Sequence, residues 1–348
     1  MKAHSELAGD VGWTAFEDLN CLGRLCLALL LVVTAPLSVA RAELREAFVD
    51  PTLTDAEIRP LTELPGAATR RLDHFVAIDS SRQNGYLYLH LVGSGGLPEN
   101  NLMVARHAAT RGFHVVSLAY PNWPAVRDLT GQSGDGAAPG AVREERLFGV
   151  DVSPLVDIDG ANSVVNRLVR LIEYLDNQHP DEQWGQFLAA GAPRWRRMLI
   201  GGHSQGAGHA AYLSQEFGLA GVVLFGGPGD FVAGVGLAEW LFRSSVTPPE
   251  RLYSFVHELD PNFSAFQIAQ TALGLADFGP PQDVDIAVPD DWTTHRLIST
   301  RLDVPNDNYH GAVVVDRSLP LDDEGEPVYA PAWNYLLGMV QFTDSFGD

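Results

Sequence analysis

The serine at position 204 lies in a pattern that suits a nucleophile. It is part of the stretch GHSQG, residues 202–206, which follows an apolar run at 198–200 and precedes a small-residue segment, 207–217, with helical spacing. This order predicts a strand, a sharp turn and a helix, with Ser204 at the apex. Glycines at both flanking positions suit so tight a turn, because a Cβ there would collide with the neighbouring strand or helix. The helix would direct its free N–H groups and positive dipole end at an oxyanion forming at Ser204.

The context of this stretch decides its interpretation, because Gly-x-Ser-x-Gly arises by chance in a chain with 34 glycines. The alternative is a glycine-rich turn that joins a buried strand to a buried helix and has no chemistry. We favour the catalytic interpretation, since the predicted strand and the predicted helix both fall where a nucleophile turn requires them.

A serine hydroxyl needs a histidine to accept its proton, and the histidine needs a carboxylate to fix its tautomer. With such a turn the usual chain order is serine, acid, histidine. Four histidines follow Ser204 in the chain: His209, His257, His295 and His310. His310 is favoured because it lies in a polar loop after the last predicted strand. His295 opens that strand and is the alternative, and a hydrogen-bonded histidine without a catalytic role is the alternative for either.

The acid is expected just past the end of a strand. The strand predicted at 252–256 runs into Glu258 and Asp260, and Asp260 fits the strand-then-turn spacing better. Glu258, two residues closer to the strand, is the rival. Asp230, which follows the preceding predicted strand at 221–225, is a third candidate. A solvated turn carboxylate is the alternative interpretation of Asp260.

An oxyanion hole needs two N–H donors, and one donor contributes about 3–4 kcal/mol to the transition state. Gln205 follows the nucleophile and would supply the first. Ser94, in the glycine-rich loop 93–96 after the strand predicted at 86–92, would supply the second. This loop is followed by no Gly-Lys-Ser/Thr and by no acidic residue placed for a ribose, so a nucleotide site is not expected.

From about residue 86 to residue 315 the chain resembles the α/β-hydrolases of the serine esterase and lipase class, through the GHSQG stretch and its flanking strand and helix. Many of these proteins have a histidine where Val92 stands here. The resemblance implies the following roles: Ser204 as nucleophile, His310 as base, Asp260 as acid, and the amides of Gln205 and Ser94 as oxyanion donors.

The order of predicted elements indicates an α/β-hydrolase fold, with a mostly parallel central sheet, helices on both faces and no large separate cap domain. We assign residues 72–348 to this domain and 43–71 to an extended N-terminal arm. The strands at 74–78 and 86–92 are expected to form a hairpin. The long connection 120–160 is expected to hold only a short helix, at 143–148.

Two irregular segments, 120–150 and 231–249, follow the carboxyl ends of adjacent predicted strands and should overhang Ser204. Their aromatic residues Trp123, Phe231 and Trp240 are expected to line a substrate site; packing of these loops onto the domain is the alternative. The predicted function is hydrolysis of carboxylic esters, of a small-molecule or lipid-like substrate, through an acyl-enzyme. A serine peptidase or acyltransferase with the same triad, and a catalytically silent binding protein, are the alternatives.

Composition excludes several other classes. The 348 residues carry a formal net charge of −21, which argues against binding to nucleic acid or to anionic lipid headgroups. Cys21 and Cys26 are the only cysteines, and both precede the predicted domain. Disulfides, thiol catalysis and a cysteine zinc site are therefore not expected in the domain, and no metal or cofactor is predicted.

The apolar run Leu25–Val39 is shorter than the about 20 residues that a membrane span needs, and Ala40-Arg41-Ala42 follows it. This pattern predicts that residues 1–42 form a signal peptide and that the protein is exported to the periplasm or the extracellular space, with no stable membrane span after cleavage. The acidic residues before the run are unusual for a leader, and an uncleaved N-terminal anchor is the alternative.

Overall fold

One large β-sheet organises the described part of the chain. The computed structural model describes residues 44–61, 73–290 and 295–343. Neighbouring strands from β4 to β12 are parallel, and β1 and β2 are antiparallel at one edge, so the predicted mostly parallel sheet is confirmed. In order along the sheet its nine strands are β1 (Leu44–Val49), β2 (His74–Asp79), β4 (His114–Leu118), β3 (Leu87–Leu91), β7 (Met198–His203), β8 (Gly221–Phe225), β11 (Leu252–His257), β13 (Leu297–Thr300) and β12 (Gln282–Asp283).

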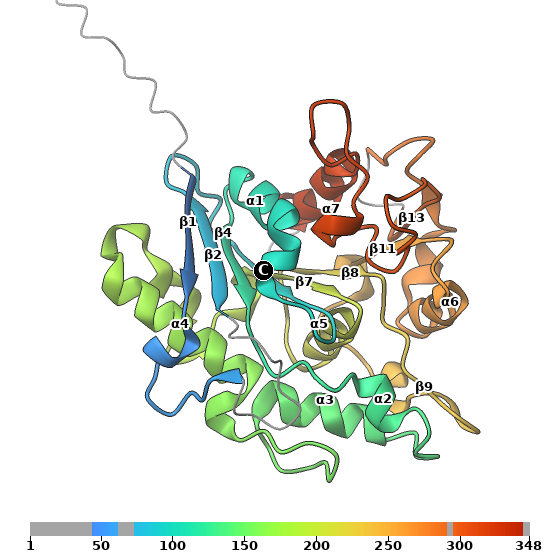
Figure 1. Ribbon diagram of the computed structural model, residues 1–348, viewed down its shortest axis with the longest axis horizontal. Helices are drawn as coiled ribbons and strands as arrows, with labels where there is room; N and C mark the ends of the chain where they lie inside the picture. Colours follow the sequence, from blue (N-terminus) through green and yellow to red (C-terminus); the bar gives the residue numbers. More distant parts are fainter. Residues whose placement is uncertain (1–43, 62–72, 291–294, 344–348) are drawn as a thin grey trace, which may run out of the picture. The chain divides into compact units, whose positions relative to one another are not determined.

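Helices cover both faces of this sheet (Figure 1). In the described residues the α-helices are α1 (Leu102–Thr110), α2 (Val126–Thr130), α3 (Ala138–Phe148), α4 (Val164–Gln178), α5 (Gln205–Glu216), α6 (Phe263–Ala272) and α7 (Ala330–Thr343). The helices α1 and α7 contribute to the apolar cluster on one face, and α4, α5 and α6 contribute to the cluster on the other. Two short ribbons, β5–β6 (Leu188–Ala189 and Ala192–Pro193) and β9–β10 (Phe231–Val232 and Gly236–Leu237), complete the strands, and no separate cap domain is present among the described residues.

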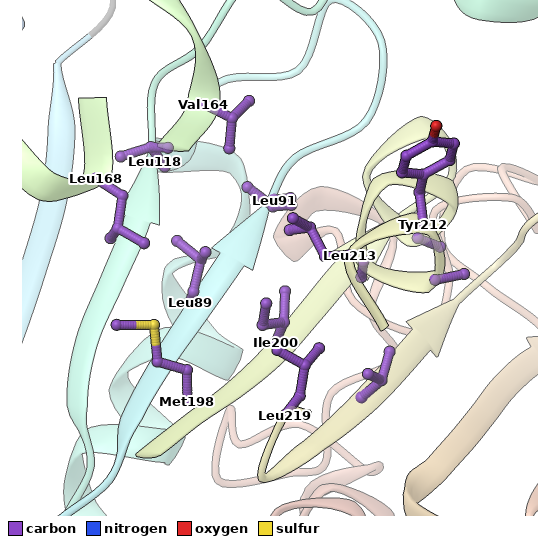
Figure 2. Close-up of a cluster of buried hydrophobic side chains, with 14 of the residues drawn as sticks. Leu89, Leu91, Leu118, Val164, Leu168, Met198, Ile200, Tyr212, Leu213 and Leu219 are labelled. Carbon is purple, nitrogen blue, oxygen red and sulfur yellow. The ribbon is translucent and has the colours of Figure 1, made fainter. Parts of the chain in front are cut away.

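The helix α4 shows how the sequence specifies these elements. Ser163 caps its N-terminus by accepting a hydrogen bond from the backbone N–H of Asn166 at 3.2 Å. Its apolar residues recur every three or four positions and therefore lie on one face of the helix. This face, which includes Val164, Leu168, Leu171, Ile172 and Leu175, is buried against the sheet. In Figure 2 Leu168 faces Leu89 of β3. Each such side chain contributes about 1.5–3 kcal/mol when fully buried.

The hairpin predicted from β2 and β3 is wrong. β2 pairs with β1 and β4, and β3 lies between β4 and β7. The reason is the crossover through α1, which returns the chain beside β3, so that β4 takes the position that a hairpin partner would occupy.

The segment assigned to an extended arm, 43–71, contains a strand in its described part. β1 pairs with β2 along its whole length and forms the antiparallel edge of the sheet. Its charged residues hid the strand signal: Arg45 pairs with Glu182, and Glu46 accepts hydrogen bonds from Arg106 at 2.7 and 2.8 Å. Charged side chains are typical of edge strands, which they protect from further pairing.

The long connection after β4 is more ordered than the sequence indicated. It contains α2 and the eleven-residue α3, where a short helix at 143–148 was expected. Pro139 near the start of α3 masked the helix, although the first helical turn tolerates proline because its N–H groups have no partner there.

The predicted signal peptide, including Cys21 and Cys26, lies outside the described residues. Within the described ranges, no helix combines the length and the apolarity that crossing a bilayer requires.

Candidate active site

The turn between β7 and α5 holds Ser204 in a backbone conformation with φ 55° and ψ −114°. A Cβ on Gly202 would lie 2.2 Å from the carbonyl oxygen of Gly206, and a Cβ on Gly206 would lie 1.9 Å from the carbonyl oxygen of Leu91. Neither position can accept a side chain without moving backbone. The two glycines are therefore what allows the turn to present Ser204 between strand and helix.

The imidazole of His310 lies between Ser204 and Asp260. Its Nε2 is 2.7 Å from the Ser204 Oγ, and its Nδ1 is 2.6 Å from the Asp260 Oδ2. The structure thus brings together the three residues that the sequence favoured. The side chain of His310 is 31% exposed and that of Asp260 is 1% exposed, so the imidazole faces solvent while its carboxylate partner does not.

Asp260 stays ionised in this position. Burial raises its pKa, but hydrogen bonds and the charge of His310, together with hydrogen bonds from Asn262, outweigh burial and hold the pKa below its ordinary value. Its Oδ1 accepts from the backbone and side-chain N–H groups of Asn262 at 2.8 and 3.0 Å, and its Oδ2 is left to His310. A carboxylate that accepts from Nδ1–H selects the tautomer in which Nε2 can accept the serine proton.

The rival candidates have other partners. Glu258 accepts from the Ser299 hydroxyl at 2.8 Å and pairs with Arg301. The imidazole of His295 does not border the hollow around Ser204 among the described residues, and its carbonyl oxygen accepts from the Tyr335 hydroxyl. Asp230 forms a buried ion pair, described below, so none of the three contacts His310 or Ser204.

A buried ion pair that sequence reasoning missed lies behind the turn. Arg143 of α3 donates to both carboxylate oxygens of Asp230 at 2.7 Å, and these side chains are 2% and 7% exposed. Arg143 also donates to the carbonyl oxygen of Gln205 at 3.0 Å, and the indole of Trp240 donates to Asp230 at 2.8 Å. This pair therefore connects α3 and the 231–249 segment to the start of α5. Its only signal in the sequence was an arginine in a helix and an aspartate after a strand.

The glycine loop 93–96 packs against the Ser204 turn. A Cβ on Gly93 would lie 3.2 Å from the Cβ of Ser204. The side chain of Asn122 donates to the carbonyl oxygens of Gly93 at 3.1 Å and Gly96 at 2.8 Å, and the backbone carbonyl oxygen of Asn122 accepts from the Gln205 side chain at 2.9 Å. Asn122 thus connects the two segments that carry the predicted oxyanion donors, and sequence reasoning did not find it.

Ser204 and His310 open into a hollow of about 820 Å³. Ser94 and Gln205 border it, as does Trp123, which is 46% exposed. Phe231 and Trp240 are not among the described residues that border it, because Trp240 is buried with its N–H on Asp230 and Phe231 belongs to the β9–β10 ribbon. The hollow falls within the range of small-molecule sites, about 300–1,000 Å³. Among the described residues, no cluster of His, Cys, Asp and Glu is arranged to hold a metal ion.

His203 bonds the backbone of His310 and lies beside its ring. Its Nε2 donates to the carbonyl oxygen of His310 at 2.9 Å, and the two ring centres are 5.0 Å apart. Burial, helped by the nearby charge of His310, lowers the pKa of His203 to about 3. His203 is therefore neutral at physiological pH and acts as a hydrogen-bond donor.

We expect the buried Arg143–Asp230 pair to dominate local stability. Asp230→Asn leaves the Arg143 charge uncompensated in the interior and should lower the free energy of unfolding by about 3–5 kcal/mol, measured by urea denaturation. The matched control is Glu173→Gln, which removes one partner of an exposed pair with Arg170 and should change it by less than about 1 kcal/mol. Equal effects of the two variants would contradict a buried, unscreened pair.

His203 should make stability depend on pH. Its pKa is about 3 in the folded chain and about 6.5 when unfolded. Between these values the unfolded chain binds more protons, so this contribution is complete above the unfolded value and is lost as pH falls toward 3. Between pH 7 and pH 5, wild type should lose about 2 kcal/mol more unfolding free energy than His203→Gln, which keeps an N–H donor. A loss no smaller in His203→Gln would contradict this origin.

No protein-family model and no curated protein matches this chain. Among solved structures, TT1662 from Thermus thermophilus is 16% identical over 86% of this chain and 99% of its own, with a TM-score of 0.40. Esterase B from Lactobacillus rhamnosis, in complex with a tributyrin phosphonate inhibitor, is 12% identical over 87% and 85%, with a TM-score of 0.42. An esterase from Pyrobaculum calidifontis is 14% identical over 75% and 74%, with a TM-score of 0.37.

At such identities and TM-scores, these similarities do not decide the fold or the activity. The chain's own architecture decides the fold. Its parallel strands run in the order β4-β3-β7-β8-β11-β13, helices cover both faces, and the serine turn lies between β7 and α5. The described chain has the α/β-hydrolase fold.

Proposed function

We propose that this protein is a serine-dependent hydrolase that cleaves carboxylic esters through an acyl-enzyme. The observation that carries the proposal is the pair of contacts made by His310, 2.7 Å to the Ser204 hydroxyl and 2.6 Å to the Asp260 carboxylate. A hydroxyl, an imidazole and an ionised carboxylate in hydrogen-bond reach of one another form the minimal apparatus for activating a serine.

In the first half of the reaction, the Ser204 Oγ attacks the ester carbonyl carbon while Nε2 of His310 takes the hydroxyl proton. The carbonyl oxygen becomes an oxyanion, and Asp260 stabilises the imidazolium through Nδ1–H. The intermediate collapses, the bond to the alcohol oxygen breaks, and His310 returns the proton to the leaving alcohol. In the second half, His310 takes a proton from water, which attacks the acyl-enzyme. Collapse releases the carboxylic acid, and the proton returns to Ser204.

The oxyanion is proposed to bind the backbone N–H groups of Gln205 and Ser94. The N–H of Gln205 lies in the first turn of α5, where it has no intrahelical acceptor. The side chain of Asn122 donates to the carbonyl oxygens of Gly93 and Gly96, and the Gly96 N–H donates to the Gly93 carbonyl oxygen at 2.9 Å, so these contacts hold the loop that carries Ser94. Donors fixed in advance stabilise a developing charge without reorganising during the reaction.

A peptidase or acyltransferase would use the same three residues and differ only in its acyl donor and acceptor. A silent binding protein would have no requirement for His310 to contact both partners, so the two contacts favour catalysis.

A fluorophosphonate probe tests this directly, because only an activated Ser204 reacts with it. Peptide mapping should locate the label on Ser204, whereas a folded protein without label would support the binding role.

Loss of the nucleophile or of its acid should remove turnover. Ser204→Ala should lower kcat for 4-nitrophenyl butyrate by about 10⁴-fold or more, and Asp260→Asn should lower it by about 10³–10⁴-fold, because the imidazole then takes the wrong tautomer. The control Ser81→Ala alters an exposed serine that contacts Asp79 and should leave kcat unchanged. Full activity of Ser204→Ala would refute the proposal.

Asn122→Ala should lower kcat by about tenfold with a smaller change in KM, because the loop donor contributes mainly in the transition state. Steady-state kinetics on 4-nitrophenyl butyrate measure both parameters. Asn177→Ala, at an exposed asparagine in the last turn of α4, is the control and should match wild type. A rise in KM at constant kcat would show instead that Asn122 acts only in substrate binding.

A further inference from the structure

The hollow around Ser204 differs in the sign of its charge from the rest of the chain. The charged side chains that border it are Arg127, Asp128, Arg143, Asp230 and Arg317. Three arginines against two aspartates make this lining net positive, whereas the whole chain carries −21. A cleft whose lining carries a net charge attracts ligands of the opposite sign.

Two of these charges neutralise each other. Arg143 and Asp230 are joined by two hydrogen bonds of 2.7 Å and are almost fully buried. Their role is to hold the segments behind the turn, and their opposite charges leave little net field in the hollow. The charges that remain for a ligand are therefore Arg127, Arg317 and Asp128.

Arg127 and Arg317 have weak partners or none. The side chain of Arg127, on α2, is 66% exposed, and it lies 3.9 Å from Asp128 and 3.3 Å from the Asn262 side chain. Arg317, in the short helix η11 (Asp316–Ser318), is exposed and makes no ion pair with another described residue. Exposed ion pairs at such distances contribute little.

The chain has 44 acidic residues for 23 basic ones. Several arginines outside the hollow bond a close carboxylate: Arg106 bonds Glu46 at 2.7 Å, and Arg170 bonds Asp55 at 2.9 Å and Glu173 at 2.8 Å. Others, such as Arg82, donate to a backbone carbonyl oxygen instead. Two guanidinium groups without such a partner therefore lie in the same hollow as the nucleophile, although carboxylates are abundant in the chain.

Building on the proposed ester hydrolysis, we propose that the substrate is an ester that carries a carboxylate group, and that Arg127 and Arg317 bind this carboxylate. A guanidinium presents its N–H groups as a planar fork that matches the two oxygens of a carboxylate. A hollow of about 820 Å³ has room for both an ester and a charged group. The class includes half-esters of dicarboxylic acids and esters whose alcohol part bears the acid.

Two matched substrate pairs test this proposal. On the acyl side, mono-4-nitrophenyl glutarate is compared with its neutral methyl ester; on the alcohol side, 4-acetoxybenzoate is compared with methyl 4-acetoxybenzoate. Wild type should prefer the anionic member of at least one pair in kcat/KM. Raising NaCl from 50 to 500 mM should reduce that preference, because salt screens exposed charges.

The arginine variants should remove the preference. In Arg127→Gln and in Arg317→Gln, kcat/KM for the preferred anionic ester should fall about tenfold further than for its neutral partner, which is the effect of one charge-assisted hydrogen bond. Arg317→Lys should restore part of the preference. The control Arg82→Gln removes an exposed arginine that does not border the hollow and whose guanidinium donates to the carbonyl oxygen of Thr110 at 3.4 Å; this variant should behave as wild type.

The outcomes separate this proposal from the function on which it rests. Turnover of the neutral esters with no preference for the anionic ones, in wild type and both variants alike, would overturn carboxylate recognition and leave ester hydrolysis intact. Binding can also be measured without catalysis, by titrating glutarate into Ser204→Ala in a calorimeter. Binding that weakens about tenfold in Ser204→Ala/Arg317→Gln would support recognition even if no ester were cleaved, and undetectable binding to both would overturn it.

Discussion

At Gly202 and Gly206 the turn before α5 approaches neighbouring backbone so closely that no side chain fits, and the rest of the site depends on this approach. Because the glycines carry no side chain, β7 can lie between β3 and β8 while α5 begins at the residue after Ser204. The positive φ of Ser204 is held by packing on all sides rather than by its own preference. A strained residue of this kind persists only where its surroundings fix it, and here the buried elements around α5 do so.

Gln205, the residue after the serine, connects this turn to the segment between β4 and α4. The Gln205 side chain accepts from the Val126 N–H at 2.8 Å and from Arg146 at 2.9 Å, and it donates to the Asn122 carbonyl oxygen. Burial lowers the pKa of Arg146 to about 10, so its guanidinium remains charged at neutral pH. Because these polar groups are buried, each one left without a partner would cost about 1–3 kcal/mol. The network therefore fixes the connection between β4 and α4 to the turn.

The sequence allowed the local parts of this structure to be predicted and left its long-range parts open. Apolar runs identified the central strands but not β1, and glycine spacing identified the Ser204 turn. Spacing from a strand end favoured Asp260, and the position of a polar loop after the last predicted strand favoured His310. The pairing of β2 with β4 and the contacts of Arg143 and Asn122 depend on residues tens of positions away, for which periodicity carries no signal. Trp240 was predicted to line the site because its segment follows the carboxyl end of a strand beside the Ser204 turn, but its side chain is buried and its indole donates to Asp230.

The charge of the chain acts at two different ranges. Its −21 net charge is spread over the surface, and at physiological ionic strength a surface charge is felt over only about 8 Å. An anion that approaches the protein meets a weak repulsion, which affects the rate of encounter. Inside the hollow, direct hydrogen bonds from a guanidinium fork decide affinity, because they act at contact distance with less intervening solvent. With a single lysine in the chain, arginine supplies nearly all of these cations, and its rigid fork is the donor best matched to a carboxylate. An acidic protein can thus select an acidic substrate, provided that the guanidinium groups in its hollow have no close carboxylate of their own.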